Sequence, residues 1–319
     1  MRYLELVDES VSLYVEHLER TRGSLSLSGN VAARCLIDTL EAARTKGQSL
    51  QATEVSATWR QMAAASVDDA DGLLNQWQLG YGDDAAPVIS VGTEHAYELR
   101  PLDRHKHPMD VGLAEITSEC LVAAIWRCNS RPDVLKWMLS APWWNWQAEF
   151  SEARPYHVYT ADYYRTGTRA TWPTLGRDVL RGGTDWRTVL GQRCYQIELS
   201  GYPALQSVGG REPLKARIDF LKKVVTTMRD TARVLLLHGT PKFAVHDSRA
   251  SVGASFLGVA ELGQPTGQGT DSNGRRWETY DRNGWRVIFS RALSGTNVSS
   301  EYLEVISKLI AEVAPSQGG

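Results

Sequence analysis

The sequence predicts an α/β fold: an α/β/α sandwich around a mostly parallel central sheet of about four strands, with a helical region in front of it. Two observations carry this prediction. Short apolar runs at residues 88–91 and 234–237 each end near a glycine turn, as buried parallel strands do. The amphipathic segment 212–229 comes shortly before the second run, and a helix followed by a strand is the repeating unit of doubly wound sheets.

A helical region precedes the sheet. In the first quarter of the chain, apolar residues recur every three or four positions, and a break between two helices is expected at residues 26–30. A third helical stretch at 57–77 ends in the turn-rich residues 80–84. We therefore predict that residues 1–84 form a helical N-terminal region and residues 85–319 the α/β domain.

The α/β domain contains further predicted elements. Residues 113–126 have a helical apolar face, and residues 191–203 begin as a strand and end in a Gly/Pro loop. The glycine-rich segment 263–274 is expected to be a flexible loop. A short strand at 277–280 then turns through the next four residues into a last strand at 285–289.

The chain closes with a predicted helix. Apolar residues at helical spacing run to Val313, and Ser300 and Glu301 suit the first turn. This helix completes the α/β domain.

Composition and charge are those of an ordinary globular protein. Hydrophobic residues make up 42% of the 319 residues, and the net charge of −2 gives no overall attraction to nucleic acid, although local charge can still bind it. No apolar run approaches the roughly 18 residues that span a bilayer, and the acidic N-terminus lacks the apolar stretch of a secretory signal. We expect a cytoplasmic protein that does not bind membranes, and the sequence indicates no protein partner.

Neither the cysteines nor the histidines are spaced as a metal site. The cysteines form no Cys-x-x-Cys pair and are expected to be reduced thiols: Cys35, Cys120, Cys128 and Cys194. His105 and His107 could place two imidazoles on one side of an extended segment, together with His95, but no carboxylate accompanies them. We expect neither a metal nor another cofactor.

Residues 87–97 (PVISVGTEHAY) are the strongest candidate for a reactive loop. The strand ends at Gly92, which lets the backbone turn and come close to a ligand. Polar or aromatic side chains follow: Thr93, Glu94, His95 and Tyr97. In open α/β sheets, ligands bind at the carboxyl ends of the strands. The alternative is a strand followed by an ordinary polar loop.

An aromatic-rich insertion lies around residues 137–170. Four of the eleven tryptophans fall within residues 137–146, and tyrosines and arginines follow, among them Arg165 and Arg169. Aromatic residues interleaved with arginine suit stacking on bases together with phosphate contacts. The alternative for the tryptophans is a rigid aromatic core under a long insertion.

Two later strands also carry candidate site residues. Gln196 or Glu198 could read the edge of a planar base, since a glutamate accepts hydrogen bonds from an exocyclic amine, and a solvent-facing position is the alternative. His238 is expected at the same end of its strand as Glu94 is of its own. These positions predict a single site at one edge of the sheet.

Strands that each end in a polar loop, followed by a loop and a helix, resemble the uracil-DNA glycosylase superfamily over most of the α/β domain. Residues 92–97 (GTEHAY) resemble its water-activating loop, Gly-x-Asp-Pro-x-x, with Glu94 at the catalytic acid. Residues 289–294 (FSRALS) lie where the family has His-Pro-Ser-Pro-Leu-Ser, the loop that enters the minor groove. No proline follows Glu94, and Phe289 replaces the family's histidine, so Arg291 is expected to supply the polar contact. The cysteines lack the paired spacing of members with an iron–sulfur cluster.

The resemblance implies a DNA glycosylase that hydrolyses the N-glycosidic bond of a flipped nucleotide and leaves an abasic site. Glu94 would activate water and stabilise the cationic sugar, and no lysine stands out as a Schiff-base nucleophile, which predicts a monofunctional enzyme. The base-binding candidates are Gly92, Thr93, His95, Tyr97, Gln196, Glu198 and His238. The candidate DNA contacts are Ser290, Arg291, Ser294, Lys242, Arg165 and Arg169.

Changes at both motifs, together with the aromatic insertion, indicate a base that is bulkier than uracil. Bacterial anti-phage glycosylases that remove glucosylated hydroxymethylcytosine from phage DNA have a similarly divergent profile. Two alternatives stay open. One is a non-catalytic nucleic-acid-binding module with a glycosylase-like fold, and the other is a hydrolase of free nucleosides or nucleotides.

Overall fold

The computed structural model forms two compact units, each assembled from separate parts of the chain. The first contains Met1–Leu79, Glu94–Pro155 and Gly201–Gly209, and the second contains Gly80–Thr93, Tyr156–Ser200 and Gly210–Gly319. The structure describes residues 3–46, 69–73, 75–77, 79, 85–92, 95–96, 194–199, 203–204, 215–239, 247–291 and 300–313. The predicted helix at 113–126 and the aromatic insertion lie outside these ranges.

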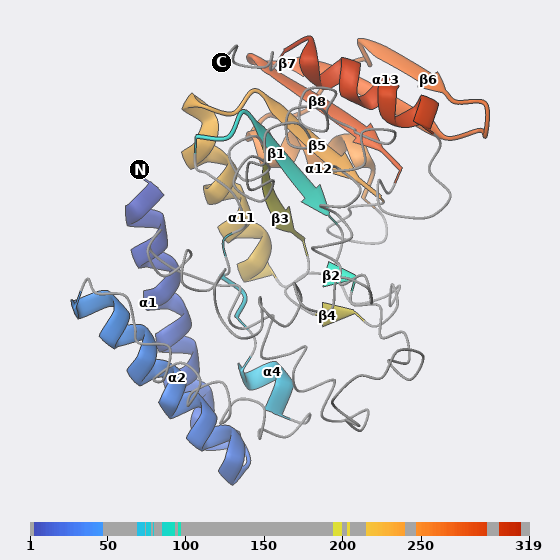
Figure 1. Cartoon of the computed structure of the whole chain (residues 1–319). Coiled ribbons are helices and arrows are strands. Elements are labelled where there is room, and N and C mark those ends of the chain that lie inside the picture. The colour runs from blue at the N-terminus through green and yellow to red at the C-terminus, as the bar shows by residue number, and fades with distance from the viewer. Residues whose placement is uncertain are drawn as a thin grey trace, which may run out of the picture. The chain divides into compact units, whose positions relative to one another are not determined.

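The second unit is built on a six-stranded sheet (Figure 1). In spatial order the strands are β3 (Cys194–Glu198), β1 (Val88–Gly92), β5 (Val234–His238), β8 (Trp285–Ser290), β7 (Arg276–Arg282) and β6 (Gly267–Thr270). The first four strands are parallel to one another, whereas β7 is antiparallel to both of its neighbours, β8 and β6. The α/β class is confirmed, but the expected mostly parallel sheet of about four strands is wrong, because the sheet is larger and mixed.

A two-residue hairpin turn makes the sheet mixed. Asn283 (φ 52°) and Gly284 (φ 78°) join β7 to β8, and positive φ at both central residues is the type I′ geometry that suits tight hairpins. The sequence predicted a turn at this point, but it did not predict that β7 would pair with β8 and so extend the sheet in the antiparallel sense.

The edge strand β6 falls in the segment that was expected to be a flexible loop. A side chain at Gly269 would bring its Cβ within 2.6 Å of Trp277 Cζ2, because the indole of Trp277 covers this part of the neighbouring strand. Glycine is required where a large aromatic ring lies so close to the backbone. The close packing of Trp277 against Gly269 therefore explains why glycine occurs at this position of a strand, although the glycines of this segment had indicated a loop.

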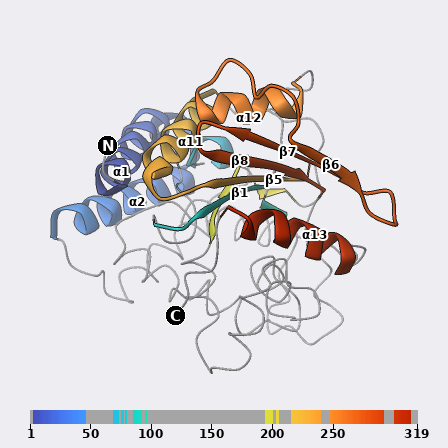
Figure 2. The same ribbon diagram turned by 90° about the horizontal axis from the view of Figure 1, so that it is seen from above.

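Helices cover both faces of the sheet (Figure 2). Helices α11 (Lys215–Thr227) and α12 (Arg249–Leu257) lie on one face, and α13 (Ser300–Ala311) lies on the other. α11 and α13 agree with the predicted helices, while α12 was not predicted. Its ends carry ordinary signals: the Ser248 side chain accepts a hydrogen bond from the Ser251 N–H, and Gly258 has a left-handed conformation.

An ion-pair network joins β7, β8 and α13. The Arg286 guanidinium donates to both carboxylate oxygens of Asp281, at 2.8 and 3.0 Å, and also to Glu312. These hydrogen bonds hold the pKa of the Asp281 carboxyl below its ordinary value. The cross-strand pair of Asp281 with Arg286 therefore helps to fix the register of the hairpin.

The first unit contains the long helices α1 (Tyr3–Thr21) and α2 (Leu27–Lys46), joined through the 3₁₀ turn η1 (Arg22–Ser24). The break was expected at residues 26–30, but it lies earlier because α2 already begins at Leu27. Ser26 caps α2 by accepting from the Gly29 N–H, and the Asp69 carboxylate accepts from both the N–H and the hydroxyl of Ser26.

A short segment with buried polar groups packs on α1 in the same unit. It contains α4 (Ala70–Leu73), and the hydroxyls of Tyr14 and Thr21 donate to backbone carbonyls of this segment at 2.6 and 2.9 Å. The two-residue strands β2 (His95–Ala96) and β4 (Pro203–Ala204) also belong to this unit and pair in parallel. None of the helices in the described ranges is long and apolar enough to cross a membrane.

Candidate functional site

The carboxyl ends of the four parallel strands meet at one edge of the sheet. Gly92 of β1 pairs with Glu198 of β3, and His238 of β5 pairs with Ser290 of β8. Val91 pairs with Leu237, so Gly92 and His238 are each one residue beyond this pair. The four residues therefore form a single row across the strands, with Gly92 and His238 at the same end of the sheet.

Backbone hydrogen bonds continue past the ends of the strands and hold the exits in place. The Leu199 N–H donates to the Gly92 carbonyl at 3.0 Å, and the Gly239 N–H donates to the Ser290 carbonyl at 3.1 Å. Gly239 has φ 83°, a conformation that glycine adopts at little cost. The chain can therefore turn immediately after His238 while the row stays in register.

His238 is a partly exposed residue whose imidazole stays neutral at physiological pH. Burial lowers the pKa of this side chain to about 4, because removal from water disfavours the charged imidazolium. A neutral imidazole can accept one hydrogen bond and donate another without adding charge. At this edge of the sheet it can recognise a polar group of a ligand.

Arg249 is a second polar side chain at this edge of the sheet, and sequence reasoning did not single it out. It is the first residue of α12, and its guanidinium donates to the Gly239 carbonyl at 3.1 Å. The available signal was Ser248, a good N-cap residue shortly after the His238–Gly239 turn. Arg249 places positive charge beside the exit of β5.

Ser290 and Arg291 have different environments at the end of β8. The Ser290 side chain is fully buried, and its hydroxyl donates a hydrogen bond to the Arg291 carbonyl at 2.9 Å. In this structure the Ser290 hydroxyl therefore stabilises the backbone at the end of β8. Arg291 is exposed. Of these two candidate DNA contacts, Arg291 is the one whose side chain reaches solvent.

Phe289 belongs to the hydrophobic core. It is fully buried and makes an edge-on ring contact with Tyr280, with centroids 5.6 Å apart. On the same side, a Cβ at Gly253 of α12 would lie 3.0 Å from Phe289 Cζ. The position at which the resembled family has a histidine therefore carries no polar group toward the row.

Several predicted site residues lie outside the described part of the chain: Thr93, Glu94, Tyr97, Arg165, Arg169, Lys242 and Ser294. For Gln196 and Glu198 the backbone is described in β3, and for His95 the backbone is described in β2 of the first unit. Their roles stay predictions. Within the described ranges, no group of three or more His, Cys, Asp or Glu side chains could hold a metal ion.

Comparison with family models finds no match for this chain, and the comparisons with curated proteins and with solved structures find none either.

Proposed function

We propose that this chain is a monofunctional DNA glycosylase that acts in the cytoplasm on a flipped, modified base. The observation that carries the proposal is the row at the carboxyl edge of the sheet, where Gly92, Glu198, His238 and Ser290 lie in register. A pocket at such an edge suits a base that has been turned out of the helix, because strand ends supply backbone and side-chain groups from several directions.

The proposed chemistry is hydrolysis of the N-glycosidic bond. Glu94, two residues after Gly92 in the sequence, activates a water molecule and stabilises positive charge on the sugar as the base departs. His238, as a neutral imidazole, hydrogen-bonds the base, and Gln196 or Glu198 reads its edge. The products are a free base and an abasic site in DNA. Modified cytosine in phage DNA is the substrate class that the resemblance favours.

The test is incubation of the protein with DNAs that contain uracil, cytosine, hydroxymethylcytosine or glucosylated hydroxymethylcytosine. Mass spectrometry detects released bases, and alkali cleavage detects abasic sites. We expect release from one modified DNA and its loss in Glu94→Gln, which keeps the side-chain volume but removes the carboxylate. Full release by that variant would contradict the assigned role of Glu94.

One observation favours a second candidate function. Phe289 is buried under α12, so the end of β8 carries no imidazole. A protein that binds DNA without cutting the glycosidic bond would have no need of such a group. Retained DNA binding with no base released from any DNA of the panel would support this non-catalytic module.

A further inference from the structure

The row at the carboxyl edge continues past β8 onto the antiparallel strands. Glu278 pairs with Phe289, so the same register places Trp277 beside Ser290 and Arg276 beside Arg291. Trp277 in turn pairs with Gly269 of β6. Arg276, at the start of β7, and Arg291, the residue after β8, therefore lie side by side, one residue beyond the row of the proposed site.

Tyr302 of α13 holds the backbones of these two arginines together. Its hydroxyl accepts a hydrogen bond from the Arg291 N–H at 2.8 Å and donates to the Arg276 carbonyl at 3.0 Å. The hydroxyl thus spans the gap between the two strands at the point where their own pairing stops. Tyr302 is completely buried, so its position is fixed by packing.

The side chains of Arg276 and Arg291 are exposed, and neither forms an ion pair with another residue of the described ranges. Their neighbour Arg275 differs, since its guanidinium lies 3.5 Å from the Asp271 carboxylate. Arg276 and Arg291 therefore present positive charge to solvent.

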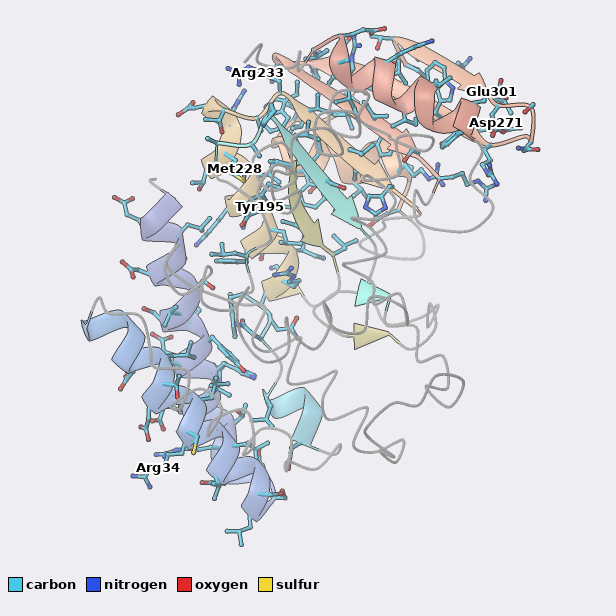
Figure 3. All side chains as sticks on the ribbon, in the orientation of Figure 1. Arg34, Tyr195, Met228, Arg233, Asp271 and Glu301 are labelled. Atoms are coloured by element: carbon cyan, nitrogen blue, oxygen red, sulfur yellow. The ribbon has the colours of Figure 1, made fainter. Side chains whose placement is uncertain are left out.

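The acidic side chains near the two arginines are engaged in local hydrogen bonds. Asp271 accepts from the N–H groups of Asn273 and Arg275, and Glu301 accepts from the Ser272 hydroxyl at 2.7 Å. Figure 3 shows Asp271 and Glu301 close together at this end of the second unit, far from Arg233, which directly precedes β5. Both carboxylates therefore form hydrogen bonds with residues 272–275, which connect β6 to β7.

Arg249 adds a third cation. Burial and the negative charge of Asp271 raise the pKa of the Tyr302 hydroxyl, whereas the backbone hydrogen bond from Arg291 and the positive charges of Arg249 and Arg291 lower it. Both guanidinium groups therefore lie within electrostatic range of this hydroxyl. Arginines therefore lie at the exit of β5, just after β8 and at the start of β7, with the Asp271 carboxylate in the same electrostatic range.

We propose that Arg276 and Arg291, set side by side by Tyr302, bind phosphate groups of the DNA strand beside the proposed excision site. This inference rests on the proposed function, because the row at the carboxyl edge fixes where the flipped nucleotide enters. Guanidinium groups suit this role, since they bind phosphate oxygens through two parallel N–H donors. The phosphodiester backbone repeats its charge and so matches a line of cations.

The test measures binding of a fluorescent, unmodified DNA duplex by anisotropy over a series of NaCl concentrations. We expect Arg276→Ala and Arg291→Ala each to weaken binding about tenfold, as loss of one charge-assisted contact does. Each should reduce the slope of log K against log salt by about one, and the double variant by about two. Arg282→Ala is the matched control, because it removes an exposed arginine from the other end of β7.

Tyr302→Phe tests whether the positions of Arg276 and Arg291 matter in addition to their charges. It keeps every cation but removes both hydrogen bonds, so we expect weaker binding with an unchanged salt slope. A circular dichroism spectrum and an unfolding curve like those of the wild type confirm that the variant is folded. Equal DNA affinity for wild type, Arg276→Ala and Arg291→Ala would overturn the inference, as would an equal loss in Arg282→Ala.

The outcomes distinguish this inference from the proposed function. If the wild type releases a base and the arginine variants bind DNA and release the base as the wild type does, the inference about the arginines is wrong while the proposed function stands. If no base is released but the arginine variants lose DNA affinity, the glycosylase assignment fails alone. Absence of DNA binding by the wild type, or equal binding to anionic lipid vesicles that the variants also lose, would overturn the choice of DNA as partner.

Discussion

At the scale of single residues, burial decides which groups at the carboxyl edge are chemically available. Ser290 and Phe289 are adjacent in the sequence, and both are fully buried, one through its hydroxyl bond to Arg291 and the other through the core. His238 is partly exposed and neutral. At these strand ends, His238 therefore has a side chain that solvent can reach, the Ser290 hydroxyl bonds the local backbone and Phe289 belongs to the core.

The neutral state of His238 makes stability depend on pH. Its folded pKa of about 4 lies below the ordinary value of 6.5, so between these pH values the unfolded chain takes up a proton that the folded chain does not. Its contribution to stability is complete above pH 6.5 and is lost as the pH falls toward 4.

We therefore expect His238→Gln to reduce the difference in unfolding free energy between pH 8 and pH 5 by about 1 kcal/mol, a value that allows for partial exposure. Urea unfolding of both proteins at the two pH values measures it. An unchanged difference would show that the imidazole is protonated equally in the folded and unfolded states.

At the scale of elements, tight turns and close approaches explain the arrangement of the hairpins. The β7–β8 turn needs positive φ at Asn283 and Gly284, and β6 needs glycine under Trp277. The sequence meets these local requirements, but their effect is on the tertiary structure. They add two antiparallel strands to the sheet, and the start of β7 brings Arg276 beside Arg291.

Gly284→Ala should destabilise the protein by about 1 kcal/mol, because an alanine at φ 78° is strained even though no atom crowds its Cβ. Gly23→Ala is the matched control: it also has open space around its Cβ and does not have positive φ. Thermal or urea unfolding compares the two variants. Equal stability of the two would mean that the turn relaxes at no cost.

At the scale of the whole molecule, the chain forms two compact units whose segments alternate along the sequence. Within the first unit, the Asp69 carboxylate accepts two hydrogen bonds from Ser26, the residue that caps α2, across 43 residues of sequence. Its negative charge also favours the positive end of the helix dipole. Such long-range polar bonds hold the N-terminal helices to the segment that contains α4.

Asp69→Asn should therefore loosen the first unit while the second keeps its protection. Hydrogen exchange followed by mass spectrometry should show faster exchange in α1 and α2, with unchanged exchange in β5 and β8. The reason is that asparagine keeps one acceptor oxygen but loses the other and the negative charge, and the interactions with Ser26 belong to the first unit alone. Equal acceleration in β5 and β8 would show instead that the two units unfold together.

The local elements of this protein were largely determined by the sequence alone. Apolar runs predicted β1, β5 and β8, helical spacing predicted α11 and α13, and the Asn-Gly pair predicted the turn before Trp285. These predictions are correct because burial period and turn chemistry act over a few residues. Glu94 and the other candidates outside the described ranges stay predictions from the sequence.

The tertiary structure decided which strands and side chains are neighbours. Only strand pairing puts Glu198, Gly92, His238 and Ser290 in one row, and only the packing of α12 and α13 reveals the roles of Arg249 and Tyr302. Sequence reasoning missed β6 because glycine signals a loop unless its neighbours are known, and it missed α12 although both ends of this helix carry ordinary capping residues. The physical reason is that register and packing join residues far apart in the chain, and no local pattern contains that information.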